Sequence, residues 1–331
     1  MDGLKTSDYL LDTAKGHIEG KISINEAQRR IQNYYEERSE RLEVQAETME
    51  ADIVSARIAM LLGERTFQFS PVELLTIHRR LFEGVFEHAG RIRPYNISKR
   101  EWVLKGDSVI YAACDSIKDI LEYDFYTEKQ FSYEGLSLQE SVKHLAKFTS
   151  DIWQIHPFCE GNTRTTAVFV IKYMKTFGLE VSNDVFAEHS WYFRNALVRA
   201  NYNNLKNGIH ATTEYLELFF SNLLLNTNYE LKNRFIHVDY ESKLETGNIQ
   251  SEMKNVLKGK NFTLNFTLEE LAILRLIAAD PAITQKEIAV KIGKSDRTVK
   301  NKMAMLQDKQ YIRRMNGKRN GRWEILVELP S

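Results

Sequence analysis

Residues 156–165, HPFCEGNTRT, bring an imidazole, a carboxylate, an amide and a guanidinium together within a few positions. A histidine titrates near neutral pH, so His156 could serve as a general base. The Glu160 carboxylate is an oxygen ligand that suits a hard divalent cation. Glycine and asparagine at the start of a helix leave backbone N–H groups that can bind an anion. The alternative is that His156 and Pro157 only end one helix while Asn162 caps the next.

Two apolar segments must position this run. Residues 136–155 place apolar side chains three and four positions apart, and Ser137 with Glu140 fits a capping box, so we expect a helix that faces the core. Residues 166–177 are apolar nearly all round and are followed by Gly178, which is typical of a buried helix. The run is then a tight corner inside a domain, where polar groups must be satisfied by one another or by a ligand.

This run resembles the signature of the Fic family, His-Pro-Phe-x-Asp/Glu-Gly-Asn-Gly-Arg-x-x-Arg. Eight of the nine residues from His156 to Arg164 fit it, the free position at Cys159 included. Thr163 replaces a glycine, and Ala167 stands where the second arginine would be. A β-branched residue at position 163 predicts a right-handed helical backbone there.

The resemblance implies that AMP is transferred from ATP to a hydroxyl of a Tyr, Thr or Ser on a target protein, with Mg²⁺ as the cofactor. It assigns the general base to His156 and the metal to Glu160. It assigns the nucleotide to Gly161, Asn162, Thr163, Arg164, Asn201 and Tyr192. Because Ala167 removes a γ-phosphate contact, weaker ATP binding or another nucleotide donor is open. The other function class is a nucleotide-sensing transcriptional regulator with little or no transferase activity.

Residues 95–110 are strand-like and hairpin-like among helices, and they follow the turn Gly90-Arg91-Ile92-Arg93. In the Fic family, the segment after such a turn is a β-hairpin flap that binds the target by strand addition. The matching stretch here is residues 96–103, with the target-binding flap at Asn96, Ile97, Ser98 and Lys99. An ordinary surface hairpin is the alternative.

Residues 1–45 carry two apolar stripes of helical spacing joined at Gly20, which predicts a helical hairpin. Many Fic proteins have an inhibitory Ser/Thr-x-x-x-Glu-Gly/Asn motif in such a helix. Glu19-Gly20 could end one, although Lys15 stands where Ser or Thr is needed. Glu19 is therefore a candidate inhibitory residue, and a hairpin that serves only packing is the alternative.

Residues 266–331 read as three helices and a β-hairpin, with Gly293 between the second and third helices. This order resembles a winged helix-turn-helix domain. It carries 13 lysines and arginines against 8 acidic residues, a net charge of +5, and the remainder of the chain is at −5. Basic residues on the third helix and wing suit phosphate contacts with double-stranded DNA. The candidates are Lys294, Arg297, Lys300, Lys302, Arg319 and Arg322; a protein-interaction or dimerisation module is the alternative.

The expected fold class is mainly α: a Fic-type helical bundle with a small β-hairpin flap, plus a C-terminal winged helix-turn-helix domain. The expected domains are a hairpin at 1–45, a catalytic domain at 46–225, a linker at 226–265 and the winged domain at 266–331. The 331 residues include only two cysteines and no long apolar run. We therefore expect a cytoplasmic protein without a disulfide framework or a membrane partner. The oligomeric state is open, a homodimer included.

Overall fold

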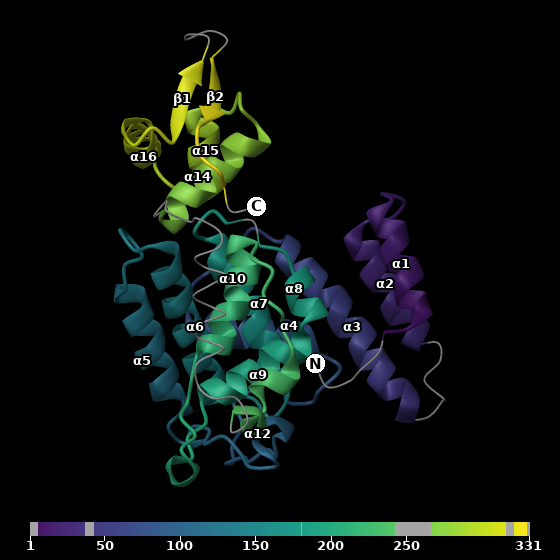
Figure 1. Cartoon of the computed structure of the whole chain (residues 1–331). Coiled ribbons are helices and arrows are strands. Elements are labelled where there is room, and N and C mark those ends of the chain that lie inside the picture. Colours follow the sequence, from purple (N-terminus) through teal and green to yellow (C-terminus); the bar gives the residue numbers. More distant parts are fainter. Residues whose placement is uncertain (1–5, 37–42, 180, 242–265, 316–320, 330–331) are drawn as a thin grey trace. The chain divides into compact units, whose positions relative to one another are not determined.

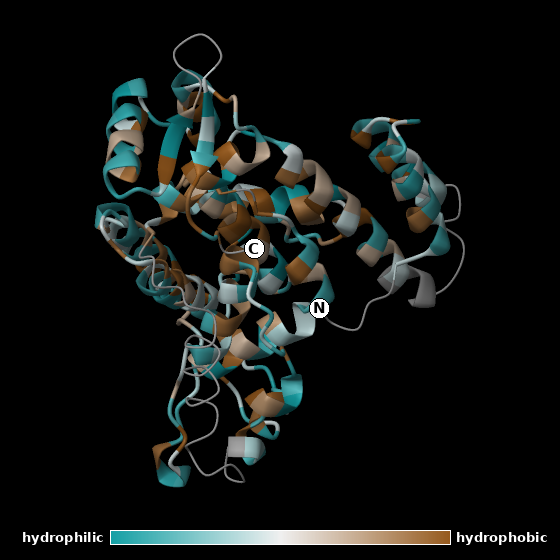
Figure 2. Cartoon of the chain, turned by 45° about the horizontal axis from the view of Figure 1, so that its top comes forward, coloured by the Kyte–Doolittle hydropathy of each residue, from teal (hydrophilic) through white to brown (hydrophobic). Residues whose placement is uncertain are grey.

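The computed structural model describes residues 6–36, 43–179, 181–241, 266–315 and 321–329. Within these ranges the chain is helical apart from one two-stranded sheet and its loops, as Figure 1 shows. Hydrophobic and hydrophilic residues alternate along most helices, so these helices are amphipathic (Figure 2). No helix in the described ranges is long and apolar enough to cross a lipid bilayer.

The chain forms two compact units, each built from several segments. The first comprises Met1–Ile97, Tyr111–Phe125 and Ile155–Lys172, and the second comprises Ser98–Ile110, Tyr126–Gln154 and Tyr173–Ser331. The first unit holds the signature run. The second holds the flap segment from Ser98 onward and the C-terminal winged elements.

The first unit begins with the predicted helical hairpin. Its helices are α1 (Asp8–Ile18) and α2 (Ile24–Glu36), and Gly20 takes the left-handed backbone that the turn between them needs. Leu10 of α1 and Ile31 of α2 pack against α3 (Glu43–Gly63). These contacts confirm the expected hairpin.

The rest of the first unit is formed by α4 (Pro71–Phe82), the start of α5 (Ile117–Gln130) and most of α7 (Asn162–Lys175). Ser70 caps α4 by accepting from the N–H of Glu73, and Pro71 occupies the first helical turn, where its missing N–H costs nothing. Phe169 of α7 lies in the core with its ring 5.2 Å from Phe67.

Within the described residues, the second unit contains six more helices before the C-terminal winged elements. They are α6 (Leu138–Ile155), α8 (Asp184–Glu188), α9 (Ser190–Ala200), α10 (Glu214–Leu225), α11 (Asn233–Ile236) and α12 (Val238–Glu241), with short 3-10 turns at Trp102–Leu104 and Leu205–Asn207. The predicted capping box of α6 is present, because Ser137 and Glu140 exchange hydrogen bonds. Helices α11 and α12 lie within the predicted linker, and residues 242–265 of that linker are outside the described residues.

The C-terminal elements follow the predicted order. They are α14 (Leu268–Ala279), α15 (Gln285–Ile292), α16 (Asp296–Asp308), β1 (Ile312–Met315) and β2 (Arg322–Ile325), with Ile312 opposite Ile325 in the antiparallel pair. Thr267 and Thr284 close capping boxes, and Gly293 ends α15 in the left-handed conformation. Each of these three helices therefore begins at a capping residue that is visible in the sequence.

The flap expectation needs correction. No strand forms between residues 95 and 110; the segment is a loop around the 3-10 turn at Trp102–Leu104. The N–H of Lys99 donates to the Ser108 hydroxyl rather than to a backbone carbonyl, and the N–H groups of Glu101 and Gly106 bond to Asp107 and Glu101. Side-chain and turn bonds thus replace the ladder that a β-hairpin requires.

Candidate active site

Helix α6 ends at Ile155, and the chain turns sharply at His156. This residue has φ of +50°, in the left-handed region that non-glycine residues rarely adopt. Its side chain is 3% exposed, and its ring centroid lies 4.2 Å from that of Tyr111. The strained turn separates the imidazole from the helix and places it at the corner that the sequence predicts.

Gly161 ends the loop just before α7. Its φ is +77°, and a Cβ atom there would lie 2.4 Å from the Phe82 ring. Glycine is therefore required by the close approach of Phe82 as well as by the backbone angle. Thr163 lies in the first turn of α7, which confirms the predicted helical backbone.

Asn162 closes the signature loop through its side chain. Its side-chain Oδ1 accepts from the Phe158 N–H at 2.9 Å, and its Nδ2 donates to the Phe158 carbonyl at 2.7 Å. The amide therefore closes the loop on itself. Donation from Asn162 to a phosphate stays a prediction, and the N–H groups in the first turn of α7 could bind an anion at the same place.

Arg164 makes a buried ion pair that the sequence did not predict. Its guanidinium lies 2.5 Å from the Glu50 carboxylate of α3, and the two side chains are 9% and 19% exposed. The guanidinium also lies over the Phe82 ring, 4.8 Å from the centroid. Arg164 is thus held at the start of α7 with its charge matched by a carboxylate.

Glu160 is exposed at the corner, and its backbone carbonyl is fixed by the His78 ring at 3.0 Å. Within the described residues no cluster of three or more His, Cys, Asp or Glu could hold a metal ion. Mg²⁺ commonly binds through one or two carboxylates together with substrate phosphates, so a single exposed carboxylate fits that mode.

The second unit contains the two residues expected to contact adenine. Tyr192 is 2% exposed on α9, and burial raises the pKa of its hydroxyl. Tyr192 and Phe193 thus face the core, whereas Trp191 on the same helix is exposed. The contact of Tyr192 with a nucleotide stays a prediction. Asn201 ends α9, and its amide nitrogen donates to the Ser150 hydroxyl at 2.9 Å and the Leu197 carbonyl at 3.0 Å. Its role at a nucleotide stays a prediction.

The four expected flap residues lie on the loop. Asn96 accepts the Cys114 N–H through Oδ1 at 2.8 Å, and Lys99 donates its N–H to Ser108. Asn96 and Ser98 are exposed, while Ile97 and Lys99 are half-buried.

The flap loop is fixed to α9 and to the residues just after it. Buried Glu101 pairs with Arg194 of α9, and the Tyr202 hydroxyl donates to Asp107 at 2.7 Å. Glu19, the candidate inhibitory residue, pairs with Lys21 at 2.6 Å, and its inhibitory role stays a prediction.

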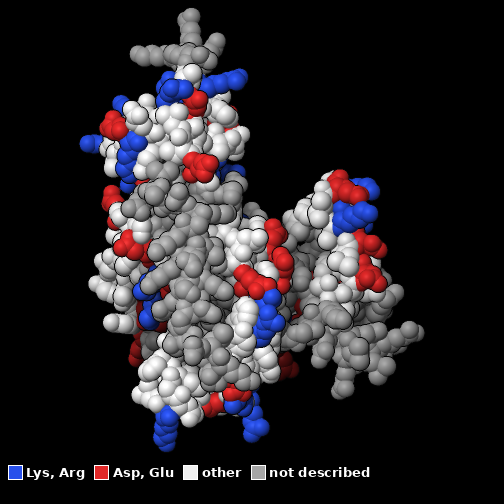
Figure 3. Space-filling model, viewed as in Figure 1, with Lys and Arg blue, Asp and Glu red and all other residues white. Residues whose placement is uncertain are grey.

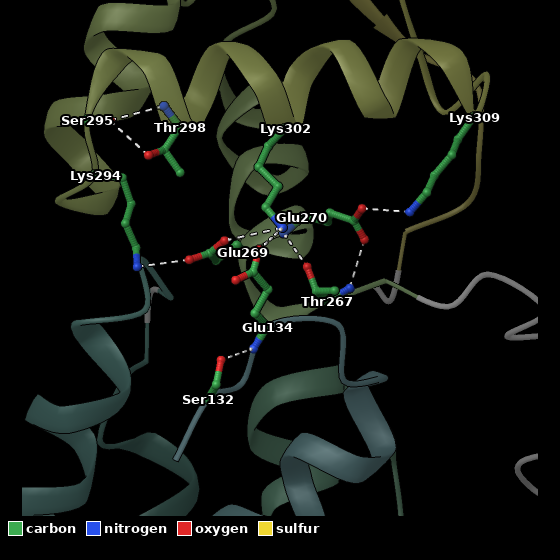
Figure 4. A network of polar contacts seen from close by, with 10 residues as sticks. All are labelled: Ser132, Glu134, Thr267, Glu269, Glu270, Lys294, Ser295, Thr298, Lys302 and Lys309. Atoms are coloured by element: carbon green, nitrogen blue, oxygen red, sulfur yellow. Dashed lines mark hydrogen bonds and ion pairs between the residues drawn. The ribbon is translucent and has the colours of Figure 1, made fainter. Parts of the chain in front are cut away.

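The basic residues of the winged domain fall on two sides of α16. Lys294 and Lys302 point toward Glu269 of α14, at 2.9 and 3.6 Å, as Figure 4 shows. Both lysines thus pair with a carboxylate, and their contacts with DNA stay a prediction. Arg297 and Lys300 are exposed on the other side of the helix.

The wing adds further basic residues. Arg322 is exposed, while Arg319 lies outside the described residues. Arg313 pairs with Glu324, and Arg314 lies over the Trp323 ring. In Figure 3, several Lys and Arg side chains appear in the part of the molecule where Figure 1 draws these elements.

Three residues of the first unit that act on the signature run were missed. They are Glu50, His78 and Arg93, whose contacts with the run span 114, 82 and 63 sequence positions. Only Arg93 had a local signal, as the last residue of the Gly-x-x-Arg turn.

Residues 68–174 match the Fic/DOC family, and residues 270–313 match a winged helix-turn-helix DNA-binding family. A protein adenylyltransferase of Bartonella henselae is 25% identical over 195 residues, which is 54% of this chain and 36% of that relative. The chain thus spans about a third of the relative's length.

Two solved structures are similar to about half of this chain. BepC of Bartonella tribocorum with bound AMPPNP is 21% identical with a TM-score of 0.44, covering 54% of this chain and 86% of that one. The Fic domain of a cell filamentation protein of Bartonella quintana with bound ADP is 21% identical with a TM-score of 0.43, covering 53% and 84%. The chain therefore carries a Fic/DOC-family domain at residues 68–174 and a winged helix-turn-helix domain at residues 270–313.

Proposed function

We propose that this chain is a protein adenylyltransferase that moves AMP from ATP to a hydroxyl side chain of a target protein. The observation that carries the proposal is the corner at residues 156–164, where a histidine, an exposed carboxylate and a helix N-terminus with an arginine meet. The Fic/DOC match and the adenylyltransferase relative support this reaction class.

In the proposed reaction, His156 takes the proton of the target hydroxyl as its oxygen attacks the α-phosphorus of ATP. The new P–O bond forms on the target, the bond from the α-phosphorus to the bridging oxygen breaks, and pyrophosphate leaves. The strained turn at His156 fixes the imidazole relative to α7, and positioning of this kind is a large part of catalysis in phosphoryl transfer.

The first turn of α7 would bind the phosphates through its outward N–H groups and its positive dipole end. Arg164 would add a guanidinium at the same place, once it is released from Glu50. Glu160 would hold Mg²⁺, which supplies positive charge to the phosphates when bound. The Ala167 side chain has no polar atom, so the site lacks the contact that the family's second arginine would make with the γ-phosphate.

Radiolabelled nucleotides test this proposal directly. The full chain is incubated with Mg²⁺ and ATP labelled at either the α- or the γ-phosphate, with and without a cell lysate. We expect protein labelling only from α-labelled ATP, together with pyrophosphate release. His156→Ala should abolish labelling, and His189→Ala is the matched control. Equal labelling by the wild type and His156→Ala would remove this histidine from the mechanism.

A second candidate function is a nucleotide-sensing regulator, and the Glu50–Arg164 pair favours it because that pair neutralises a phosphate-binding residue. Stoichiometric ATP binding without pyrophosphate release would support the sensor over the enzyme. Labelled ATP, UTP, CTP and GTP compared in parallel would identify the donor that suits a site with Ala167.

We also propose that the winged domain binds duplex DNA through the exposed side of α16. Arg297, Lys300, Asn301 and Ala304 repeat at helical spacing on that side and are all exposed. Retardation of duplex DNA by the full chain, with affinity falling steeply as salt rises, is the expected result. Binding that is absent or insensitive to salt would instead favour a protein-interaction module.

A further inference from the structure

The carbonyl groups that end α6 converge on one buried side chain, Arg93. Its Nε donates to the His156 carbonyl at 2.8 Å, and a terminal nitrogen lies 3.4 Å from the Ile155 carbonyl. Its own backbone N–H donates to the Pro157 carbonyl at 2.8 Å. Three successive carbonyls on both sides of the histidine are thus bound by one residue.

The remaining donors of Arg93 bind the carbonyls of Tyr95 and Ala112. The side chain is 1% exposed, and burial lowers the pKa of its guanidinium. Its hydrogen-bond partners in the described part of the chain are all backbone carbonyls. A buried cation without a carboxylate is costly, and carbonyls at a helix C-terminus are one of few environments that stabilise it.

A second residue outside the signature, His78, binds the other end of the loop. Its Nδ1 accepts the Gly90 N–H at 2.8 Å, which requires that nitrogen to be unprotonated. Its Nε2 must then carry the proton and donate to the Glu160 carbonyl at 3.0 Å. The ring stacks on Phe158 at 3.7 Å between centroids, so its orientation is fixed.

These contacts join the Gly90–Arg93 turn to both ends of the loop. Gly90 has φ of +76°, and a Cβ there would lie 2.6 Å from the Cβ of Arg79, so the turn itself is tightly placed. His78 binds the first residue of the turn and Glu160, while Arg93, its last residue, binds His156. A histidine in the left-handed region is strained, and this conformation persists only where neighbouring contacts over-determine it.

We infer that Arg93 and His78 are positioning residues: Arg93 holds the His156 backbone in its left-handed turn, and His78 holds Glu160. The inference rests on the proposed function for its catalytic meaning, while the geometry it describes exists without catalysis. Arg93 thereby sets the direction of the His156 imidazole. His78 fixes the backbone of Glu160, and so the position of the carboxylate that would bind the metal.

The first experiment compares Arg93→Lys with Arg91→Lys, an exposed arginine of the same turn. Lysine keeps the charge but has one nitrogen, which cannot bind the same set of carbonyls. We expect kcat of Arg93→Lys to fall about 100-fold while KM for ATP changes little, because a misplacement of about 1 Å can cost that much. Arg91→Lys should match the wild type.

The second readout does not depend on activity. The His156 imidazole is followed by NMR as a function of pH, assigned with His156→Ala, in the wild type and both arginine variants. A displaced resonance and titration curve in Arg93→Lys alone supports the inference, even if no variant transfers AMP. An unchanged His156 signal, or a kcat loss that matches only the loss of folded protein, would overturn it.

The His78 half is tested with the Mg²⁺ dependence of the same reaction. His78→Gln keeps a donor that can reach the Glu160 carbonyl, whereas His78→Leu removes it. We expect the Mg²⁺ concentration for half-maximal rate to rise at least about tenfold in His78→Leu, with partial rescue in His78→Gln. If wild-type transfer is absent, Mn²⁺ affinity in the presence of ATP replaces the rate. Equal metal dependence in wild type and His78→Leu would refute this half.

Discussion

The Glu50 carboxylate of α3 lies 2.5 Å from the Arg164 guanidinium at the start of α7. Carboxylates and phosphates compete for the same forked donors of an arginine. A nucleotide that uses Arg164 must therefore displace Glu50 or share the guanidinium with it. The pair connects the helix after the N-terminal hairpin to the proposed phosphate site.

Glu50→Gln should consequently tighten nucleotide binding. The amide keeps the size of the side chain but removes the competing charge, so we expect Kd for ATP to fall about three- to tenfold, or about 1 kcal/mol. Isothermal titration calorimetry measures this change, with Glu122→Gln on exposed α5 as the control. A Kd that stays the same or rises would show that Glu50 does not compete with the nucleotide.

Gly161→Ala should lower the free energy of unfolding for two reasons, the positive φ at this position and a clash with the Phe82 ring. The new Cβ would meet the Phe82 ring at 2.4 Å. Gly208 is a matched control, because its φ of +69° is similar but no atom lies within 4 Å of its Cβ position. We expect urea unfolding to show a loss of about 1 kcal/mol for Gly208→Ala and of about 3 kcal/mol for Gly161→Ala. Equal losses would mean that Phe82 moves aside freely.

The elements that the sequence predicted well were those with local signals. Capping residues such as Thr267 and Thr284, the turn glycines and the periodic apolar stripes describe neighbours within a few positions, and the helices followed them. The prediction of a β-hairpin flap was wrong because this segment is held by residues distant in sequence and not by hydrogen bonds between two strands. Glu101 pairs with Arg194, and Asp107 accepts from Tyr202.

The sequence predicted the candidate site only within the signature run itself, residues 156–164. Residue types at 156–164 identify the chemistry, but what holds them comes from α3, α4 and the Gly90–Arg93 turn. Nothing in a single sequence indicates that Glu50 meets a residue 114 positions away. Tyr192 is a core residue, so its match to a family position does not by itself show that it contacts a nucleotide.

Alkaline pH should weaken the attachment of the N-terminal hairpin to α3. The Tyr35 hydroxyl donates to Asp52 at 2.5 Å, and the Ser7 N–H donates to the same carboxylate at 2.8 Å. Burial and then the hydrogen bond to Asp52 raise the pKa of Tyr35 to about 12. The neutral phenol is favoured in the folded state, so this stabilisation is complete below about pH 10 and is lost as pH rises toward 12.

The comparison is between the wild type and Tyr35→Phe, since phenylalanine cannot ionise. After allowance for solvent screening, we expect the stability difference between them to shrink by about 1 kcal/mol between pH 9.5 and 11.5. Unfolding in urea at several pH values, followed by circular dichroism, measures it. Parallel pH curves for the two proteins would show that the Tyr35 proton does not stabilise the hairpin.

Two lysines on the same helix should differ in their effect on DNA binding. Lys300 is exposed on the side of α16 that carries Arg297, whereas Lys302 points toward Glu269 at 3.6 Å. If the exposed side meets phosphates, Lys300→Gln should weaken duplex binding about equally for all sequences and lower the slope of log affinity against log salt by about one unit. Lys302→Gln should leave both quantities near their wild-type values.

Fluorescence anisotropy with a labelled duplex at several salt concentrations measures the affinity and the slope together. Arg297→Gln belongs in the same set, because its side chain lies one helical turn before Lys300. Thermal unfolding separates binding from folding, since the loss of the Lys302–Glu269 pair should lower Tm slightly. A larger affinity loss in Lys302→Gln than in Lys300→Gln would place the DNA on the other side of the helix.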